Sequence, residues 1–409
     1  MGGERAVSSW VEGAAGSSYD LDNLPYGIFS TPGSPARVGV RVGDHVLDAG
    51  AVAALGGDPG EGPHLAEAWS ADSLSPFMAM GPSAWAVARE WLVEVLGDDV
   101  HRERTQPLLV PVAEVFMHQP FEVADYVDFY CSLHHATNVG RIFRPEGEPL
   151  PPNWRHLPIG YHGRAGTVVI SGTDVERPRG QRLEDDGLPS FGPSRRLDLE
   201  CELGFVVGTP AASGATVSTT GFEDHVFGVT PLNDWSARDL QAWEYVPLGP
   251  FLGKSFATSI SPWVTPLAAL SAARVDLPGQ EPEPLDYLRV SGPAGYDVAF
   301  EVVLNGEVVS RPPYSSMYWS PAQMVAHLTS NGASLRTGDL VGSGTVSGPE
   351  PDQRGSLLEL SWGGRQPLAG GRTFLEDGDT VTLRATAPGA LGGRIALGEV
   401  TGRVLPAGG

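Results

Sequence analysis

Turn-forming residues restrict the fold of this chain more than any other feature, because 53 glycines and 36 prolines make up more than a fifth of its 409 residues. Both residue types interrupt helices and strands and favour turns. Since 41% of the residues are hydrophobic, the chain can still bury a large core. The composition therefore predicts a folded, turn-rich, mainly β protein with some helices, of the α+β class, rather than a disordered chain.

The charge of the chain limits its partners. Lys and Arg number 27 against 49 Asp and Glu, which gives a formal net charge of −22. An excess of negative charge argues against binding to nucleic acid or to an anionic membrane surface. The opening stretch MGGERAVSSW has no apolar leader segment, and nowhere do about 18 apolar residues run together. We expect a cytoplasmic protein, with Cys131 and Cys201 as structural thiols of a reducing compartment.

Patterns in the first part of the chain predict a small β domain over residues 1–120. Apolar residues alternate on both sides of Gly43-Asp44, which is typical of a hairpin. Residues 82–97 show a helical period, with Ser83 as the expected N-cap and Gly97 as the end. The face of this helix that we expect to be buried carries Trp85, Ala88, Leu92 and Val95.

Residues 121–409 read as one large domain that is rich in β-strands. Near residue 120 the composition changes, and aromatic, His and acidic residues become frequent. From Leu197 onward the pattern predicts mostly short strands. Turns are expected at Asn305-Gly306 and at Glu376–Val381, and a helix is expected after Ser320-Pro321. The pattern favours a large mixed sheet domain that carries a few helices.

One expected strand, LDLECELGFVVG over residues 197–208, has three carboxylates on one face. Alternation places Leu197, Leu199, Cys201, Leu203 and Phe205 on the other, apolar face. The acidic face is either solvated, as charged faces usually are, or it holds a cation. Glu200 and Glu202 lie roughly 7 Å apart along the strand, so they can converge on one ion.

The carboxylates of Asp128 and Asp234 could complete the shell of such a cation, and Asp198 is expected to be a bystander. An all-oxygen set without paired Cys or His points to Ca²⁺, Mg²⁺ or Mn²⁺ rather than to zinc.

Two further polar segments accompany these carboxylates. Asp128, Tyr130 and His135 follow closely in a turn-rich stretch, although a lone His is more often structural than catalytic. Asn233 or Asp234 is expected to cap a short helix whose polar stripe carries Asp234, Arg238, Gln241 and Tyr245. The bulky flanks Trp235, Leu240 and Trp243 favour a lined cavity over a solvated face.

The segment LGPFLGKS is not a phosphate-binding loop. The phosphate-loop pattern requires glycine where this chain has Leu248, so Lys254 is not expected to bind a nucleotide.

Long motifs of this chain resemble the fumarylacetoacetase family. They are NLPYGIFST, DYVDFYCSLHHATNVG, PPNWRHLPIGYHGRAG, LDLECELGFVVG, NDWSARDLQAWEYVPLGPFLGKSFATSISPW and SGTVSGPEPDQRGSLLELSW. The resemblance covers nearly the whole chain. It implies an SH3-like N-terminal domain, then a mixed β-sandwich roll that forms a homodimer. It also implies hydrolysis of a carbon–carbon bond of 4-fumarylacetoacetate to fumarate and acetoacetate, the last step of tyrosine and homogentisate breakdown.

The resemblance also implies roles for individual residues. His135 matches the general base, and Glu359 matches the residue that orients it. Groups that stabilise the oxyanion match Arg238, Gln241 and Lys254. The ligands of a Ca²⁺ or Mg²⁺ match Asp128, Glu200, Glu202 and Asp234, and a second magnesium site matches Lys254 and Thr258. Positions that bind the substrate match Tyr130, Arg144, Tyr161, Gln241, Tyr245 and Thr345.

One residue departs from the family pattern, and two other functions compete with the implied one. Ala257 replaces a glycine that the family has beside the substrate pocket, which questions the fine fit of the substrate. A related acylpyruvate or keto-acid hydrolase, decarboxylase or isomerase would use the same metal. A non-catalytic, calcium-stabilised β protein would explain the carboxylates, but it would leave His135, Arg238, Gln241 and Lys254 without a purpose.

Overall fold

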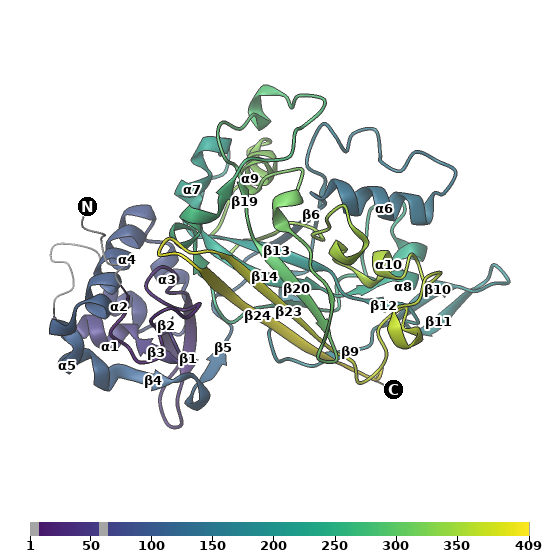
Figure 1. Ribbon diagram of the computed structural model, residues 1–409. Coiled ribbons are helices and arrows are strands. Elements are labelled where there is room, and N and C mark those ends of the chain that lie inside the picture. The colour runs from purple at the N-terminus through teal and green to yellow at the C-terminus, as the bar shows by residue number, and fades with distance from the viewer. Residues whose placement is uncertain (1–7, 57–63, 409) are drawn as a thin grey trace.

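The computed structural model describes residues 8–56 and 64–408, and its chain forms an N-terminal lobe beside a larger body built on long strands (Figure 1). The first seven residues, to which the expectation about a leader segment applies, lie outside the described range. Both fold-level expectations, a small N-terminal β domain and a large β-rich domain with few helices, are confirmed. Among the described residues, no helix combines the length and apolar character needed to cross a membrane.

The N-terminal lobe is built on a five-stranded antiparallel sheet in the order β4-β3-β2-β1-β5. The predicted hairpin is confirmed, because Val42 pairs with His45 across Gly43-Asp44. The sheet comprises β1 (Tyr26–Ser30), β2 (Arg37–Val42), β3 (His45–Asp48), β4 (Leu109–Pro111) and β5 (Phe116–His118). Its helices are α1 (Ala49–Ala54), α2 (Leu65–Trp69), α3 (Ser75–Met78), α4 (Pro82–Gly97) and α5 (Arg102–Thr105).

The predicted helix over residues 82–97 is α4, but its cap differs from the prediction. Gly81 occupies the N-cap position and Ser83 makes no capping hydrogen bond, because the helix begins at Pro82, two residues earlier than a Ser83 cap would place it. Ala88, Leu92 and Val95 are buried as expected, together with Trp91, whereas Trp85 is only half-buried.

The body contains two large sheets that enclose one core. An eight-stranded sheet has the order β7-β6-β22-β13-β14-β16-β8, with β17 on β14, and a five-stranded sheet has the order β21-β20-β23-β24-β9. The first comprises β6 (Tyr126–Phe129), β7 (Gly160–His162), β8 (Val168–Ile170), β13 (Cys201–Val207), β14 (Val226–Asp234), β16 (Thr258–Ile260), β17 (Thr265–Pro266) and β22 (Leu340–Gly342). The second comprises β9 (Val175–Glu176), β20 (Ala299–Leu304), β21 (Glu307–Ser310), β23 (Thr380–Pro388) and β24 (Arg394–Leu405).

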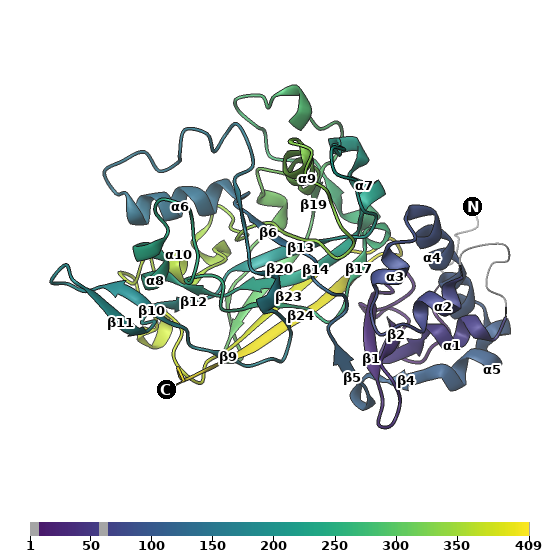
Figure 2. The ribbon, with the colours of Figure 1, turned by 180° about the vertical axis from the view of Figure 1, so that it is seen from behind.

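Shorter elements complete the body. The strand pairs are β10 (Arg179–Leu183) with β11 (Pro189–Pro193), β12 (Leu197–Asp198) with β15 (Ser236–Ala237), and β18 (Arg274–Val275) with β19 (Gly295–Tyr296). The helices are α6 (Leu133–Phe143), α7 (Phe222–His225), α8 (Arg238–Glu244), α9 (Pro321–Thr329) and α10 (Leu357–Leu360). Views from both sides place α6, α8 and α10 at the end of the body remote from the N-terminal lobe (Figures 1 and 2).

Single-turn 3₁₀ segments lie at residues 99–101, 106–108, 112–114, 165–167, 219–221, 286–288, 314–316, 351–353 and 369–371, with a longer one at 267–273. The expected turn at Asn305-Gly306 joins β20 to β21, and the expected turn after Glu376 leads into β23. The helix expected after Ser320 is α9, where Ser320 and Gln323 form a capping box.

The eight-stranded sheet is buried on both faces. On one face Leu203 and Phe205 join the core that also contains Leu383 and Val400 of the five-stranded sheet. On the other face the apolar side chains pack into the core of the N-terminal lobe, and they are Val206, Phe227, Leu232, Ile260 and Leu340. The two lobes therefore share one continuous apolar core.

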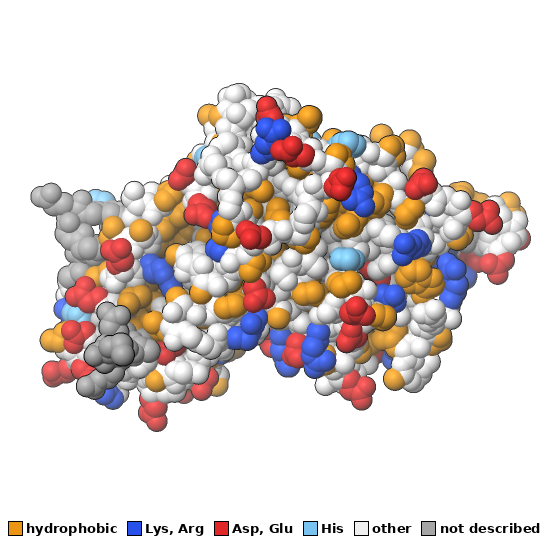
Figure 3. Space-filling view, turned by 45° about the horizontal axis from the view of Figure 1, so that its top comes forward, with side chains coloured by type: hydrophobic (Ala, Val, Ile, Leu, Met, Phe, Trp, Pro, Cys, Tyr) orange, Lys and Arg blue, Asp and Glu red, His pale blue; other side chains and the backbone are white. Residues whose placement is uncertain are grey.

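The surface carries charges of both signs. Acidic and basic side chains are interspersed with apolar ones over the face shown in Figure 3. Cys131 and Cys201 are both buried and unpaired, which agrees with their expected structural role.

Candidate active site

The segment with three carboxylates forms two strands rather than one. β12 pairs with β15, whereas β13 pairs with β14 and β22, and the chain is irregular between them at Leu199–Glu200. The apolar face is fully buried as predicted. Asp198, Glu200 and Glu202 are buried too, so the solvated-face alternative is wrong.

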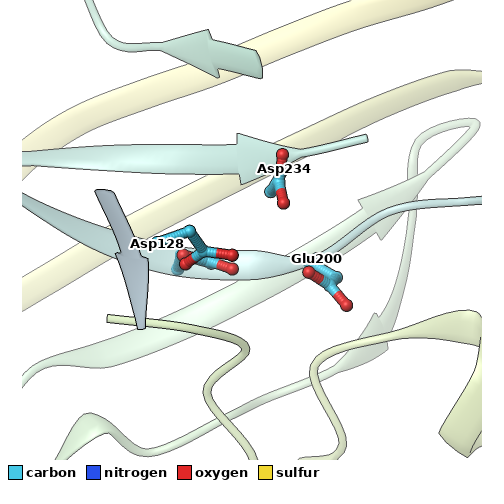
Figure 4. Close-up of side chains that lie close together, drawn as sticks. Asp128, Glu200 and Asp234 are labelled. Atoms are coloured by element: carbon cyan, nitrogen blue, oxygen red, sulfur yellow. The ribbon is translucent and has the colours of Figure 1, made fainter. Parts of the chain in front are cut away.

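Four buried carboxylates, from β6, β13, β14 and the residue before β13, converge, and oxygen atoms from all four lie within 4.8 Å of one another. They belong to Asp128, Glu200, Glu202 and Asp234, which are the predicted ligands, and the side chains labelled in Figure 4 point toward a common space. Asp128 Oδ1 and Glu202 Oε1 are buried and have no hydrogen-bond partner.

The electrostatics of this cluster favour a cation. Burial, and then the carboxylate of Asp234, raise the pKa of Asp128 well above its usual value. Burial, followed by Asp128 and Asp234, does the same to the pKa of Glu202. Buried like charges without donors are costly unless a positive charge joins them. The oxygen-only donor set fits a hard divalent cation such as Ca²⁺, Mg²⁺ or Mn²⁺.

The other two carboxylates of the cluster already have protein partners. Arg238 Nη1 lies 2.8 Å from Glu200 Oε1, and Lys254 Nζ bonds Glu200 Oε2. Although burial alone would raise the pKa of Glu200, these two cations hold it well below its usual range. Asp234 Oδ2 accepts from Lys254 Nζ at 2.7 Å, and its Oδ1 accepts from Thr258 Oγ1 at 3.0 Å.

Two glycines of the β22 segment allow the chain to approach the cluster. A Cβ at Gly342 would lie 3.0 Å from Asp128 Oδ1 and 3.1 Å from Glu202 Oε2, so a side chain there would fill the space between the carboxylates. Gly344 has a positive φ of 73°, and a Cβ there would lie 2.1 Å from the carbonyl oxygen of Phe129. Its backbone N–H donates to Glu202 Oε2 at 3.0 Å.

His135 and Glu359, 224 residues apart in the sequence, are directly bonded. Nδ1 of His135, on α6, lies 2.6 Å from Oε2 of Glu359, on α10, and both side chains are buried. Burial alone would raise the pKa of Glu359, but His135 and further hydrogen bonds lower it, so Glu359 is a carboxylate that accepts the Nδ1 proton. The other ring nitrogen, Nε2, is left free to accept a proton beside the cluster, 3.9 Å from Glu200 Oε1.

The helix that carries Arg238 and Gln241 begins later than predicted. Strand β14 continues to Asp234, where it pairs with Thr258 of β16, and α8 starts at Arg238 with no side-chain cap. Asp234 therefore reaches the site from a strand end rather than from a helical stripe. Arg238 Nη1 bonds Gln241 Oε1 at 3.2 Å, and Arg238 Nη2 is buried without a partner.

The flanks of α8 are less buried than the sequence suggested. Trp235 and Leu240 are buried as expected, but Trp243 is 41% exposed.

A cavity of about 380 Å³ connects these groups. Its polar wall is formed by most of the predicted site residues, namely Asp128, Tyr130, His135, Tyr161, Glu200, Arg238, Gln241, Tyr245, Lys254 and Thr345. Thr345 Oγ1 is buried there without a partner, and the hydroxyl of Tyr161 donates to Asp234 Oδ2 at 3.0 Å. The apolar wall includes Phe129, Val139, Phe143, Ile159 and Leu248.

Arg144, which the resemblance assigned to the substrate, and Ala257 both lie away from this cavity. The guanidinium of Arg144 is exposed and donates to the carbonyl oxygen of Pro149 at 2.8 Å, so it does not line the cavity. Ala257 packs into the apolar core and is absent from the cavity wall. The wall therefore gives no sign that Ala257 changes the fit of the substrate.

Lys254 and Thr258, the predicted second magnesium site, both bond Asp234. The carboxylates of Asp234 and Glu200 outweigh the effect of burial and raise the pKa of Lys254, so its side chain is an ammonium. An ammonium has no lone pair for a metal, and Lys254 therefore acts as a counter-charge to the carboxylates.

Sequence reasoning missed the residues that hold Glu359. Asn138 Nδ2 donates to Glu359 Oε1 at 2.9 Å, and the hydroxyls of Ser347 and Ser356 donate to Oε2, each at 2.9 Å. Two local signals could have found them. Asn138 lies three residues after His135 on a helix, and Ser356 and Glu359 fit the Ser-x-x-Glu capping pattern.

Solved structures share this fold at low sequence identity. A fumarylacetoacetate hydrolase from Exiguobacterium antarcticum aligns with a TM-score of 0.56 at 18% identity, covering 94% of this chain and 99% of its own. A maleylpyruvate hydrolase from Sphingobium aligns with a TM-score of 0.52 at 15% identity, covering 94% of this chain and all of its own. The fold is thus that of the fumarylacetoacetate hydrolase class of proteins.

Sequence comparisons make the assignment more specific. The protein-family model described as fumarylacetoacetase N-terminal matches residues 22–120. The protein-family model described as fumarylacetoacetate hydrolase C-terminal matches residues 125–404. The fumarylacetoacetase of Oryza sativa subsp. japonica is 43% identical over 99% of both chains. The fumarylacetoacetase of Homo sapiens is 44% identical over 98% of this chain and 99% of its own. The chain belongs to the fumarylacetoacetase family and is a hydrolase.

Proposed function

We propose that this chain hydrolyses the carbon–carbon bond between the acyl groups of 4-fumarylacetoacetate, giving fumarate and acetoacetate. The observation that carries the proposal is the free Nε2 of His135, a residue that lines the same cavity as Glu200 of the carboxylate cluster and Arg238. Similarity to fumarylacetoacetases over nearly the full length supports the choice of substrate. The reaction would complete tyrosine and phenylalanine breakdown.

The base of this reaction is His135. Since Glu359 accepts the Nδ1 proton, Nε2 can take a proton from the water that attacks the carbonyl carbon. Glu359 also stabilises the imidazolium that results. When the carbon–carbon bond breaks, its electron pair stays with the acetoacetate carbon, and the proton held on His135 can return to that carbon. The products are then one carboxylic acid, which contains the hydroxyl of water, and one methyl ketone, which contains its other hydrogen.

The oxyanion that follows water attack has three donors on the cavity wall. The three donor residues Arg238, Gln241 and Lys254 line this wall, and Nη2 of Arg238 has no hydrogen-bond partner. Donors that are already fixed by Glu200 and Asp198 need no rearrangement as charge develops, and this preorganisation is worth most in a water-poor site. Thr345, Tyr130, Tyr161 and Tyr245 are proposed to orient the substrate.

The carboxylate cluster is proposed to hold a Ca²⁺ or Mg²⁺ through Asp128, Glu200, Glu202 and Asp234. When bound, such a cation would act as a Lewis acid toward the oxygens of a 1,3-diketone. The unpartnered oxygens of Asp128 and Glu202 support this role, since their charge is otherwise uncompensated. The second magnesium site at Lys254 and Thr258 remains a proposal that rests on resemblance, with Lys254 supplying charge rather than a ligand atom.

The assembly is proposed to be a cytoplasmic homodimer. Apolar side chains are exposed on the β10–β11 hairpin and on the loop after α8, and they are Leu183, Leu188, Phe191, Val246, Leu248 and Phe251, with Leu248 96% exposed. An exposed apolar surface is typical of a subunit interface, so these residues mark the candidate interface. Sedimentation of the protein and of Phe191→Asp tests it, since the charge should shift the mass toward the monomer. We further propose the division into domains 1–120 and 121–409, which the ranges of the two family models support.

The test of function is direct. Purified protein, first chelated and then supplied with Mg²⁺ or Ca²⁺, is incubated with 4-fumarylacetoacetate while the diketone absorbance is followed and the products are identified. Loss of absorbance with release of fumarate and acetoacetate, absent in His135→Ala, supports the proposal. Acylpyruvates are assayed in parallel, and hydrolysis of those alone would replace the proposed substrate with the related keto-acid class.

A further inference from the structure

The third carboxylate of the LDLECELGFVVG segment, Asp198, lies outside the four-carboxylate cluster and outside the cavity wall, yet it is fully buried. Its two oxygens accept four hydrogen bonds. Oδ1 accepts from the backbone N–H of Leu199 at 2.8 Å and from that of Leu357 at 2.7 Å. Oδ2 accepts from Arg238 Nε at 2.8 Å and from the backbone N–H of Leu358 at 3.0 Å.

Three of these four donors belong to two separate parts of the site, and the fourth is the neighbouring N–H of Leu199. Arg238 is a residue of the cavity wall whose Nη2 has no partner, and Asp198 holds it through Nε, the nitrogen nearest the aliphatic stem. Leu357 and Leu358 directly precede Glu359, whose carboxylate holds Nδ1 of His135. One side chain thus joins the oxyanion donor to the segment that orients the base.

We propose that Asp198 is a positioning residue, which sets the distance between Arg238 and the His135–Glu359 pair. The inference rests on the proposed function, because it assumes that both groups act on one substrate. Asp198 lies on β12 opposite Ser236, two residues before Arg238, so the strand pairing brings it to the arginine. The segment of Glu359 approaches from elsewhere in the sequence, and Asp198 accepts from its backbone rather than from a mobile side chain.

A simple charge-balancing role explains less of the geometry. Arg238 already has Glu200 as a partner, with Nη1 2.8 Å from Glu200 Oε1. Charge balance also gives no reason for Asp198 to accept from Leu357 and Leu358. A misplacement of about 1 Å at a reacting group can cost roughly 100-fold in rate, so a residue that fixes such a spacing can matter without touching the substrate.

The test compares Asp198→Asn with a matched control. The amide of Asn keeps the shape of Asp198 but offers one acceptor oxygen instead of two, so either Arg238 or the Leu357 segment loses its anchor. Asp20→Asn is the control, since Asp20 is also buried and accepts from the backbone N–H groups of Ser9 and Leu21, but in the N-terminal lobe.

For Asp198→Asn we expect kcat on 4-fumarylacetoacetate to fall about 10–100-fold with KM changed less than about threefold, because preorganised donors act mainly in the transition state. Mg²⁺ affinity and the melting temperature should match those of Asp20→Asn, which keeps wild-type kcat. In the Arg238→Ala and Glu359→Gln backgrounds, the further loss caused by Asp198→Asn should shrink, since each background removes a group through which Asp198 acts.

Three results separate the possibilities. Wild-type protein without hydrolytic activity would overturn the proposed function itself. Active wild-type protein with a fully active Asp198→Asn variant, or with losses that multiply in both backgrounds, would overturn the positioning role alone. If Asp198→Asn does not fold, Arg238→Lys removes the same Nε contact while it keeps the charge, and unchanged kcat in that variant would also overturn the inference.

Discussion

Two groups of buried carboxylates lie within one site, and they differ in what satisfies them. Glu359 and Asp198 receive hydrogen bonds on both oxygens from side chains or backbone. Asp128 and Glu202 each keep one buried oxygen without a partner, and burial raises their pKa values well above the usual ones. Burial also raises the pKa of Asp198, whereas His135 and hydrogen bonds lower that of Glu359, so the unpartnered oxygens rather than the pKa values separate the two groups. The first group is complete as protein, and the second, the proposed cation-requiring group, is not. The comparison shows that donors around a buried carboxylate, rather than its burial, distinguish structural support from a ligand site.

The largest effect should come from His135→Ala, which removes the base but leaves the cation-requiring group intact. We expect the rate of hydrolysis to fall by about 10⁴-fold, at the upper end of what general base catalysis contributes. Divalent cation binding, measured by calorimetry, should stay near that of the wild type. Loss of cation binding in this variant would mean that the two groups of carboxylates are not independent.

In the same experiment, Glu359→Gln tests whether Glu359, a member of the group whose oxygens are all hydrogen-bonded, acts through His135. Because Glu359 acts through His135, the double variant should be little slower than His135→Ala alone. Losses that multiply in this cycle would show that Glu359 does not orient the base.

Glu202→Gln should affect the cation-requiring group. Cation affinity should fall by more than the roughly 10–100-fold typical of losing an outer partner, and activity should fall with it. The chelated variant should also be at least as stable to heat as the chelated wild type, because one uncompensated buried charge is removed. A chelated variant that melts well below the chelated wild type would contradict the view that Glu202 is electrostatically strained without a cation.

Arg238→Ala should give a smaller but specific loss. A donor aimed at an oxyanion is worth about 3 kcal/mol, so kcat should fall about 10²-fold, with a smaller change in KM. Steady-state kinetics over a range of substrate concentrations separate the two constants. An increase confined to KM would make Arg238 a substrate anchor only.

The smallest expected effect is the pH dependence of stability due to Glu359. Its pKa is lowered in the folded protein, so its carboxylate stabilises the fold above the unfolded pKa of about 4.3, and this contribution is lost as the pH falls through the folded pKa. The difference in unfolding free energy between the wild type and Glu359→Gln should therefore be largest near pH 7 and shrink in acid. Exposed Glu399→Gln serves as the control, with a difference near zero throughout.

Local patterns predicted the parts of the molecule that depend on neighbours in sequence. Alternation over Leu197–Phe205 identified the apolar face, because side chains in a strand alternate whatever surrounds it. The same alternation placed the carboxylates of Glu200 and Glu202 on one face, and both belong to the four-carboxylate cluster. The turn at Asn305-Gly306 and the helix that begins after Ser320 are likewise local features, and both are present.

The errors occurred where distant segments decide the outcome. Asp234 was expected to cap a helix, but its pairing with Thr258 of β16 extends the strand, and no local signal reveals that partner. The prediction that Asp198 is a bystander of the cation site agrees with its place outside the four-carboxylate cluster, but its own donors, 40 and 159 residues away, could not be foreseen. The substrate-binding role of Arg144, which was assigned by resemblance, stays a prediction, and in this structure its guanidinium donates to the backbone of the following loop.

The continuous apolar core between the lobes has a consequence for how substrate enters. Opening a hinge between the lobes would expose Val206, Leu232 and Leu340 to water, and burial of such side chains stabilises the closed arrangement by roughly 1.5–3 kcal/mol each. A hinge movement between the two lobes is therefore an energetically unfavourable way to admit substrate. Phe143 lines the cavity and is exposed outside that core, so a change of its rotamer can open the cavity without separating the lobes.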